Sequence, residues 1–275
     1  MIKKKHWELK KNEVIPSFKC PTCDEGHLIP DNGTLSKINL AKANELYNYT
    51  ADPSDITYTF SIISKCNNNE CNEEMLISGT NQIWENGYLS TFDQETGEQL
   101  DIPDGTPNYS NNYKIEFTSL PINLIELPQG IDKAFEAEIL KSFKLFWQDT
   151  NSCANKIRIA VEVLLTNKLK IIKRQKIKNK QKSTQTTPVY SYKTLTLGER
   201  IGKIKTETKY SKFKDLADNL KAIKWIGNDG SHSEQEISRN EIQNGYKILE
   251  HLLKKIYNSD KEIEALTKKI NKRKK

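Results

Sequence analysis

Long apolar segments are missing from this sequence, because no run approaches the 18 or more apolar residues that a membrane-spanning helix requires. The basic residues at the start are not followed by an apolar segment, so we expect no secretory signal peptide. Cysteine is also scarce, with five in 275 residues. These scarcities exclude a membrane protein and a secreted disulfide scaffold, while an apolar fraction of 36% is enough for a folded core. We therefore expect a cytoplasmic protein that contacts no membrane.

Acidic and basic residues are distributed unevenly along the chain, whose net charge is +7. Residues 1–120 hold 10 lysines and arginines against 18 acidic residues, a net charge of −8. Residues 121–275 hold 33 against 18, a net charge of +15. A strongly basic half is typical of proteins that bind a polyanion, most often nucleic acid. The alternative is an AT-rich genome, whose codons favour Lys, Asn and Ile.

The first 120 residues have the pattern of a small β-rich module. Runs of β-branched and aromatic residues predict strands at residues 57–64, 74–78 and 113–118. Residues 93–110 are rich in Asp, Gly, Pro and Asn, which predicts a loop. A short helix is expected over residues 38–47, with Ser36 as its cap.

From Pro128 onward the apolar residues follow the helical period. They predict a central helix that is apolar on nearly every side over residues 152–172, and amphipathic helices over 131–149, 197–205 and 211–225. The last helix is expected to begin where Ser238 and Glu241 form a capping box. Residues 168–182 contain eight basic residues and no acidic residue, which predicts a basic loop.

These patterns predict an α+β fold in three parts. The first part is a small β-rich module over residues 1–125. The second is an α-helical bundle over residues 126–258, into which the basic loop is inserted at 168–195. The third is a frayed basic tail over residues 259–275.

Four of the five cysteines form two close pairs, Cys20 with Cys23 and Cys66 with Cys71. In a reducing compartment, paired thiols bind metal more often than they form disulfides. Two short turns with two thiolates each complete the tetrahedral ligand set of a structural zinc ion and leave no position for a reactive water. The N-terminal module is therefore predicted to be zinc-ribbon-like, unless the spacing is accidental. Cys153 stands alone in an apolar helix and is expected to be a core thiol.

A second group of polar residues lies in the helical half. Asn228 and His232 follow Lys224 in the sequence KWIGNDGSH, where the glycines lead us to expect that the helix breaks. If this turn stays helical, Asn228 and His232 share one face. Arg158 and Glu162 are one helical turn apart and can form an ion pair. The group is either a buried network that pins two helices together or a pocket that binds or cleaves a phosphodiester.

Several of these features resemble the HEPN superfamily, the higher-eukaryote and prokaryote nucleotide-binding helical domains. They are the Arg158-x3-Glu162 helix, the Gly227-Asn228-x3-His232 turn, the terminal amphipathic helix and the Leu-Pro-x-Gly stretch at 127–130. The resemblance covers about residues 128–257 and is strongest to a bacterial family joined to restriction and other defence modules, which zinc ribbons often precede. It implies a HEPN-like bundle that forms a homodimer and works with a protein partner in a prokaryotic defence or stress system.

The resemblance also implies a candidate catalytic site. Many HEPN proteins are metal-independent ribonucleases whose signature is an arginine, four to six further residues, and then a histidine. Accordingly, His232 would transfer a proton and Arg158 would bind the phosphate, with Glu162 and Asn228 beside them. This sequence departs from the signature, because residues 225–227 include no basic side chain.

The sequence therefore leaves three alternative functions. The first is binding of RNA or a nucleotide without efficient catalysis. Four basic residues are predicted to contact phosphate in that case, namely Lys173, Arg174, Lys176 and Lys224. The second function is a metal-independent endoribonuclease that uses His232 with Arg158 or Lys224. The third is a dimeric protein-interaction adaptor.

Overall fold

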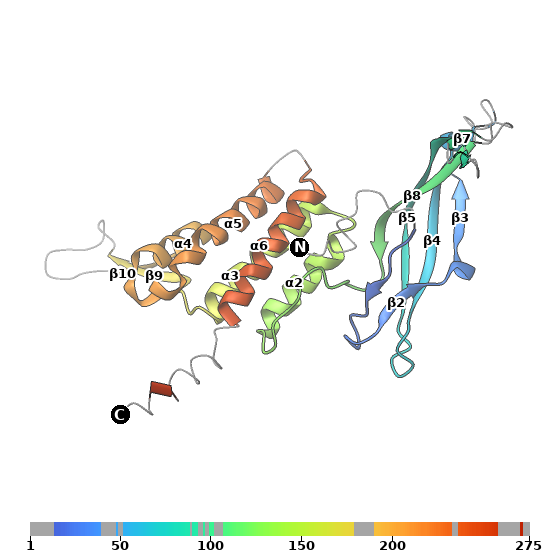
Figure 1. Cartoon of the computed structure of the whole chain (residues 1–275). Coiled ribbons are helices and arrows are strands. Elements are labelled where there is room, and N and C mark those ends of the chain that lie inside the picture. Colours follow the sequence, from blue (N-terminus) through green and yellow to red (C-terminus); the bar gives the residue numbers. More distant parts are fainter. Residues whose placement is uncertain are drawn as a thin grey trace, which may run out of the picture. The chain divides into compact units, whose positions relative to one another are not determined.

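The protein has an α+β fold that divides into two compact units, Met1–Ile122 and Asn123–Lys275, called here the N-terminal and C-terminal units. The computed structural model describes residues 14–39, 48, 52–88, 90–92, 96, 99–101, 107–178, 190–232, 236–257 and 270–271 (Figure 1). The division lies three residues before the boundary expected at residue 125.

The N-terminal unit is built on a six-stranded antiparallel sheet in the order β1-β2-β4-β5-β8, with β3 paired to β4 off this path. A separate two-stranded pair is formed by β6 and β7. The strands are β1 (Phe18–Lys19), β2 (His27–Pro30), β3 (Ser36–Asn39), β4 (Thr57–Cys66), β5 (Glu74–Tyr88), β6 (Ser90–Phe92), β7 (Gln99–Asp101) and β8 (Pro107–Thr118). Two single 3-10 turns, η2 (Asn32–Thr34) and η3 (Pro53–Asp55), begin at aspartate caps.

Alternation of buried and exposed residues explains why the predicted strands form. In β4, Phe60 and Ile62 are buried on one face of the sheet, and they lie opposite residues of β5. The predicted strands at 57–64, 74–78 and 113–118 all lie within observed strands. Two other predictions were wrong in the parts that the structure describes. Ile38 lies in β3 rather than in a helix, because it pairs with Thr59 of β4.

The second wrong prediction is the loop over residues 93–110, since β7 and the first residues of β8 fall within that range. Pro107, Asn108 and Ser110 occupy a strand because β8 pairs with β5 along its length. Residues 40–47 of the expected helix lie outside the described part of the chain.

The C-terminal unit consists of helices and one β-hairpin. The elements are α2 (Lys133–Leu145), α3 (Thr150–Asn167), β9 (Arg174–Lys178), β10 (Tyr190–Thr194), α4 (Leu197–Thr206), the 3-10 helix η4 (Thr208–Leu216), α5 (Ala217–His232) and α6 (Arg239–Tyr257). Side-chain caps mark where helices begin: Asp132 accepts from two amides of α2, and Asp149 accepts from Ser152 N. The predicted Ser238–Glu241 capping box is present at the start of α6.

The apolar helix α3 lies at the centre of this unit, as its sequence predicts. It packs against α2, α5 and α6, and α5 also packs against α4 (Figure 1). Its inner residues are fully buried, including Ile157, Val161 and Leu164. A polar network crosses this core, because Tyr246 Oη of α6 donates to Ser142 Oγ of α2 at 2.9 Å and lies 3.2 Å from Cys153 Sγ of α3.

Three helix predictions need correction. The central helix ends at Asn167 rather than residue 172, and residues 208–216 form the 3-10 helix η4 rather than the start of an α-helix. The Gly-Asn-Asp-Gly sequence does not break a helix, because α5 continues through it to His232. The physical reason lies in the packing of α5 on α3, described below.

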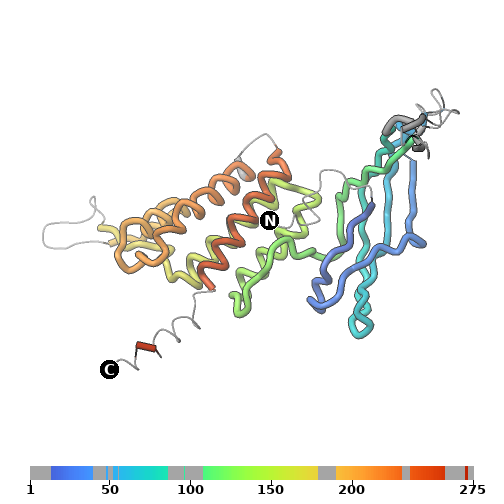
Figure 2. Tube along the Cα trace, viewed as in Figure 1, coloured from blue at the N-terminus to red at the C-terminus, as the bar shows by residue number. Residues whose placement is uncertain are grey.

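The segment predicted as a basic loop forms an antiparallel hairpin of β9 and β10 (Figure 2). Hydrogen bonding continues past the strands, since Leu195 N donates to Lys173 O at 2.9 Å. Residues 179–189 between the two strands lie outside the described residues, as does the predicted tail at 259–275 except for residues 270–271. Within the described part of the chain, no helix is both long and apolar enough to cross a membrane.

Candidate metal centre and nucleic-acid interface

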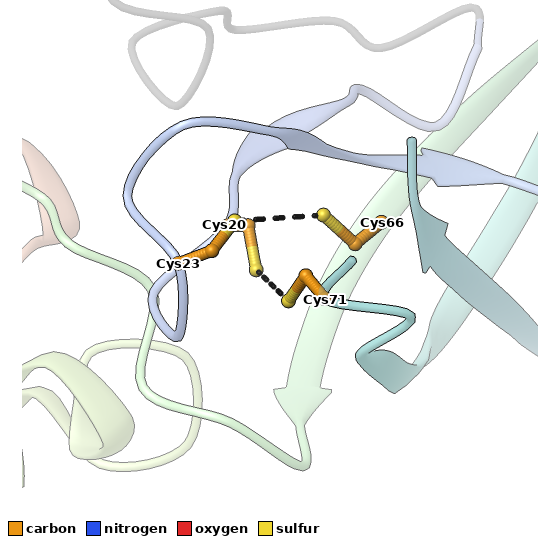
Figure 3. Close-up of side chains that lie close together, drawn as sticks. All are labelled: Cys20, Cys23, Cys66 and Cys71. Carbon is orange, nitrogen blue, oxygen red and sulfur yellow. Dashed lines mark hydrogen bonds between the residues drawn. The ribbon is translucent and has the colours of Figure 1, made fainter. Parts of the chain in front are cut away.

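Four cysteines converge at one end of the N-terminal sheet (Figure 3). Cys20 and Cys23 lie in the turn between β1 and β2, whereas Cys66 ends β4 and Cys71 lies in the turn before β5. The two turns meet because β2 pairs with β4, with Leu28 opposite Cys66. Strand register therefore brings together two cysteine pairs that are far apart in the sequence.

The distances between the sulfur atoms suit a single metal ion. Cys20 Sγ lies 3.8 Å from Cys71 Sγ, and Cys23 Sγ lies 3.8 Å from Cys66 Sγ. All four sulfur atoms lie within 4.8 Å of one another. For metal–sulfur bonds of about 2.3 Å, as zinc makes, neighbouring sulfurs of a tetrahedron are about 3.8 Å apart. The cluster can therefore hold a metal ion with little movement of its side chains.

Backbone amides are directed at the sulfurs. Gly26 N donates to Cys23 Sγ at 3.3 Å, and Asn68 N donates to Cys66 Sγ at 3.4 Å. Glycine is required at position 26, because a Cβ there would lie 2.5 Å from Cys66 Sγ. Such amide–sulfur hydrogen bonds orient metal ligands and stabilise the thiolate form.

The electrostatics of the cluster favour a cation. Hydrogen bonds from the backbone of Gly26 and Glu25 lower the pKa of Cys23 from 9.0 to about 6, so this thiol is a thiolate at neutral pH. Burial raises the pKa of Cys66, because desolvation disfavours its thiolate form, and the neighbouring thiols of Cys20 and Cys23 raise the pKa further. A bound cation would supply the missing positive charge and favour deprotonation of the remaining thiols.

In the C-terminal unit, Arg158, one of the predicted polar residues, lies at a contact between α3 and α5. Arg158 Nε and Glu162 Oε1 form an ion pair at 3.5 Å, and their side chains are 26% and 33% exposed. A Cβ at Gly227 would lie 2.4 Å from Arg158 Cβ, so the arginine lies directly against α5. Asn228 follows this glycine and is half-buried. His232 is the last residue of α5, but its side chain is not among those that the structure describes.

Two glycines explain why α5 is not broken. A Cβ at Gly230 would lie 2.6 Å from Asn151 O and 2.8 Å from Ala154 Cβ. Like Gly227, this residue therefore allows α5 to approach the backbone of α3 closely. The glycines serve close helix packing rather than a turn, which is the reason that the predicted break is absent.

The four basic residues predicted to contact phosphate lie in two places. Lys173 precedes β9, and Arg174 and Lys176 lie in β9 with exposed side chains. Lys224 lies apart from them on α5, with its Nζ 4.2 Å from the ring centroid of Trp225 and near Gly198 of α4. The structure therefore brings three of the four together and places the fourth elsewhere.

A small cavity is lined by one residue of the predicted polar group on α3 and by one of the predicted phosphate-binding residues. It has a volume of about 270 Å³, and both Glu162 and Lys173 line it, together with Thr166 and Arg200. Arg200 is 1% exposed and was not predicted. Its guanidinium donates to Thr166 Oγ1 at 2.7 Å and to Ile171 O at 3.1 Å, so it ties α4 to the end of α3. An arginine in an amphipathic helix gives no sequence signal of burial.

The fold and the cysteine cluster define an α+β protein with a tetrathiolate site that can hold a metal ion. Residues 8–102 match a family model described as Domain of unknown function (DUF8608). Residues 141–273 match a second model, described as Domain of unknown function (DUF4145). The chain is thus similar to one family in each unit. No curated protein and no solved structure matches it.

Proposed function

We propose that this protein binds RNA through its C-terminal unit, as a HEPN-like module of a prokaryotic defence or stress system without efficient catalysis. Its N-terminal unit is held together by one structural zinc ion on Cys20, Cys23, Cys66 and Cys71. The observation that carries RNA binding is the hairpin β9–β10, which exposes a row of cations. The four-thiolate ligand set and its 3.8 Å spacings support zinc, which thiolates bind tetrahedrally.

The cations of the hairpin are available to a polyanion. Arg174, Lys176 and Lys178 are exposed, and within the described residues none lies within ion-pair distance of a carboxylate. By contrast, Lys193 of β10 is engaged by Glu199. Cations without acidic partners can release counterions from a nucleic-acid backbone, which is the main source of non-specific affinity. The net charge of +15 over residues 121–275 acts in the same direction.

The geometry at α3 supports binding more than catalysis. Arg158 is already paired with Glu162 and partly covered by α5, so a phosphate would have to compete with a carboxylate for it. Residues 225–227, where the ribonuclease signature would place its arginine, offer no substitute. A site of this kind lacks the free guanidinium that stabilises charge on a phosphodiester in the transition state.

RNA binding is tested with the triple variant Arg174→Gln/Lys176→Gln/Lys178→Gln, by fluorescence anisotropy of labelled single-stranded RNA over a range of salt concentrations. The matched control is Lys65→Gln/Lys114→Gln/Lys144→Gln, which removes the same charge from exposed positions outside the hairpin. We expect the logarithmic salt slope to fall by about 2 in the hairpin variant, because each lost contact contributes about 0.7 for a single strand. Equal slopes in both variants would contradict the proposal.

A second candidate function is a metal-independent endoribonuclease. It is favoured by one observation, namely that α5 remains helical as far as His232, so that positions 228 and 232 lie one turn apart on the same helix. The test is incubation of mixed structured and single-stranded RNA with wild-type protein, His232→Ala and Arg158→Ala, with EDTA present. Cleavage that both substitutions abolish while the fold is kept would establish this function. Intact RNA with well-folded protein would reject it.

A further inference from the structure

The register of the hairpin places both of its tyrosines and three of the four basic residues in its strands on one face. Residues directly opposite in an antiparallel pair project from the same side of the sheet. Tyr190 lies opposite Lys178, Tyr192 opposite Lys176, and Thr194 opposite Arg174. These six residues make up what is called here the ribbon face. The opposite face carries the intervening residues, which are Gln175, Ile177, Ser191 and Lys193.

The two tyrosines are unusually exposed for large aromatic residues. Tyr192 is 70% exposed and Tyr190 is 50% exposed. A contact within the hairpin accounts for part of this arrangement, since Lys176 Nζ lies 4.2 Å from the ring centroid of Tyr190. For Tyr192 no ring contact is found among the described residues, so hairpin stability does not explain its position.

The spacing of the tyrosines distinguishes single-stranded from double-stranded ligands. Residues two apart on a strand are separated by about 6.8 Å, whereas stacked bases in a duplex are about 3.4 Å apart. Within a duplex both faces of each base are covered by neighbouring bases. An aromatic ring can therefore stack only on a base of an unpaired strand, and the tyrosine spacing allows one base on each ring.

We infer that the ribbon face binds single-stranded nucleic acid, with one unpaired base stacked on Tyr190, a second on Tyr192, and the flanking phosphates on Arg174, Lys176 and Lys178. This inference rests on the proposed function and names its substrate class. Stacking supplies affinity that tolerates different bases, while the cations supply the part that depends on salt. The ribbon face is thus a binding surface separate from the Arg158–Glu162 pair on α3.

The inference is tested by comparing Tyr190→Ser/Tyr192→Ser with Tyr190→Phe/Tyr192→Phe in anisotropy titrations, with single-stranded RNA, the same-sequence DNA and the RNA duplex as probes. The serine variant should lose about thirtyfold or more in affinity for single strands, because two stacking contacts are removed, while its salt slope stays at the wild-type value. The phenylalanine variant should bind like wild type, because its rings still stack. Wild-type protein should prefer either single strand to the duplex.

Each contrary result has a distinct meaning. Unchanged affinity in the serine variant, or tighter binding of the duplex, would overturn base stacking and leave the proposed RNA binding intact. Absence of any binding by wild-type protein would overturn both. Photocrosslinking of wild-type protein to bromouridine-substituted RNA needs no substitution: crosslinks at Tyr190 or Tyr192 support the inference, and crosslinks confined to other residues contradict it.

Discussion

The two units of this protein are stabilised in different ways. The N-terminal unit is a sheet in which the pairing of β2 with β4 brings two cysteine turns together at the cluster of four thiols. The C-terminal unit has a helical core around α3, fully buried residues on α2, α3, α4, α5 and α6, and a polar network within it. The first unit therefore has a site that can hold a metal ion beside its buried sheet residues, whereas the second is stabilised by the packing of its helices. The net charges differ as well. Residues 1–120, which contain the cysteine cluster, carry a net charge of −8, whereas residues 121–275, which contain the hairpin, carry +15.

Removal of the metal is the largest perturbation that this contrast predicts. Chelation of reduced protein should release about one zinc ion per chain and abolish order over residues 15–80, because ligand binding and folding are coupled in such sites. Residues 133–257 should keep their helices. Cys20→Ser should behave like the chelated protein, whereas Cys153→Ala should retain zinc, since Cys153 lies in the helical core. Metal analysis together with limited proteolysis measures both effects, and reduced protein without zinc would contradict the cluster's role.

Arg200 gives the largest expected effect within the helical unit. Arg200→Met removes a buried guanidinium that donates to Thr166 Oγ1 and Ile171 O, leaving these acceptors without that donor. We expect a loss of about 2–3 kcal/mol in the free energy of unfolding, measured by urea denaturation. Arg158→Met is the comparison, since its half-exposed ion pair should contribute less than 1 kcal/mol. Equal losses in the two variants would show that the greater burial of Arg200 does not make it contribute more to stability than Arg158.

The close approach of α5 to α3 is tested by a pair of glycine substitutions. Gly230→Ala should destabilise the unit by about 1–3 kcal/mol, because its Cβ would lie 2.6 Å from Asn151 O. Gly202→Ala on α4 meets nothing within 4 Å and should stabilise by about 0.5–1 kcal/mol, as alanine normally does in a helix. Thermal unfolding of both variants gives the comparison. Stabilisation by both would mean that the two helices are not in tight contact.

A further comparison concerns alkaline pH. Burial raises the pKa of Cys153 from 9.0 to about 12, so the folded unit keeps a neutral thiol where the unfolded chain would ionise. The stability that this thiol contributes is fully present below pH 9 and is lost as the pH rises towards 12. Urea unfolding between pH 7 and pH 11 should show this decline, and Cys153→Ala should weaken it. An identical pH dependence in the variant would assign the decline to other groups.

The sequence predicted features that depend on local geometry. The cysteine pairs could be recognised because a short turn fixes two ligands, and the Ser238–Glu241 capping box because its partners are three residues apart. The central position of α3 followed from its apolar composition. In each case the feature depends either on contacts between residues that are close in the sequence or on the composition of one segment.

Other features depend on contacts that the sequence does not display. Gly227 and Gly230 predicted a break, because glycine usually weakens helices, yet the approach of α3 makes them necessary. The basic segment predicted a loop, because the partner strand that pairs with it begins only at Tyr190. The ribbon face could not be predicted either, since it depends on the register between β9 and β10.

Hydrogen–deuterium exchange of the full, zinc-loaded chain with and without single-stranded RNA tests the central claim most directly, because it locates the bound surface in either unit. The account predicts protection of residues 174–178 and 190–194, with exchange around Cys20 and Cys66 unchanged. Protection confined to the cysteine turns, or to the middle of α3 around Arg158, would contradict the assignment of RNA binding to the hairpin.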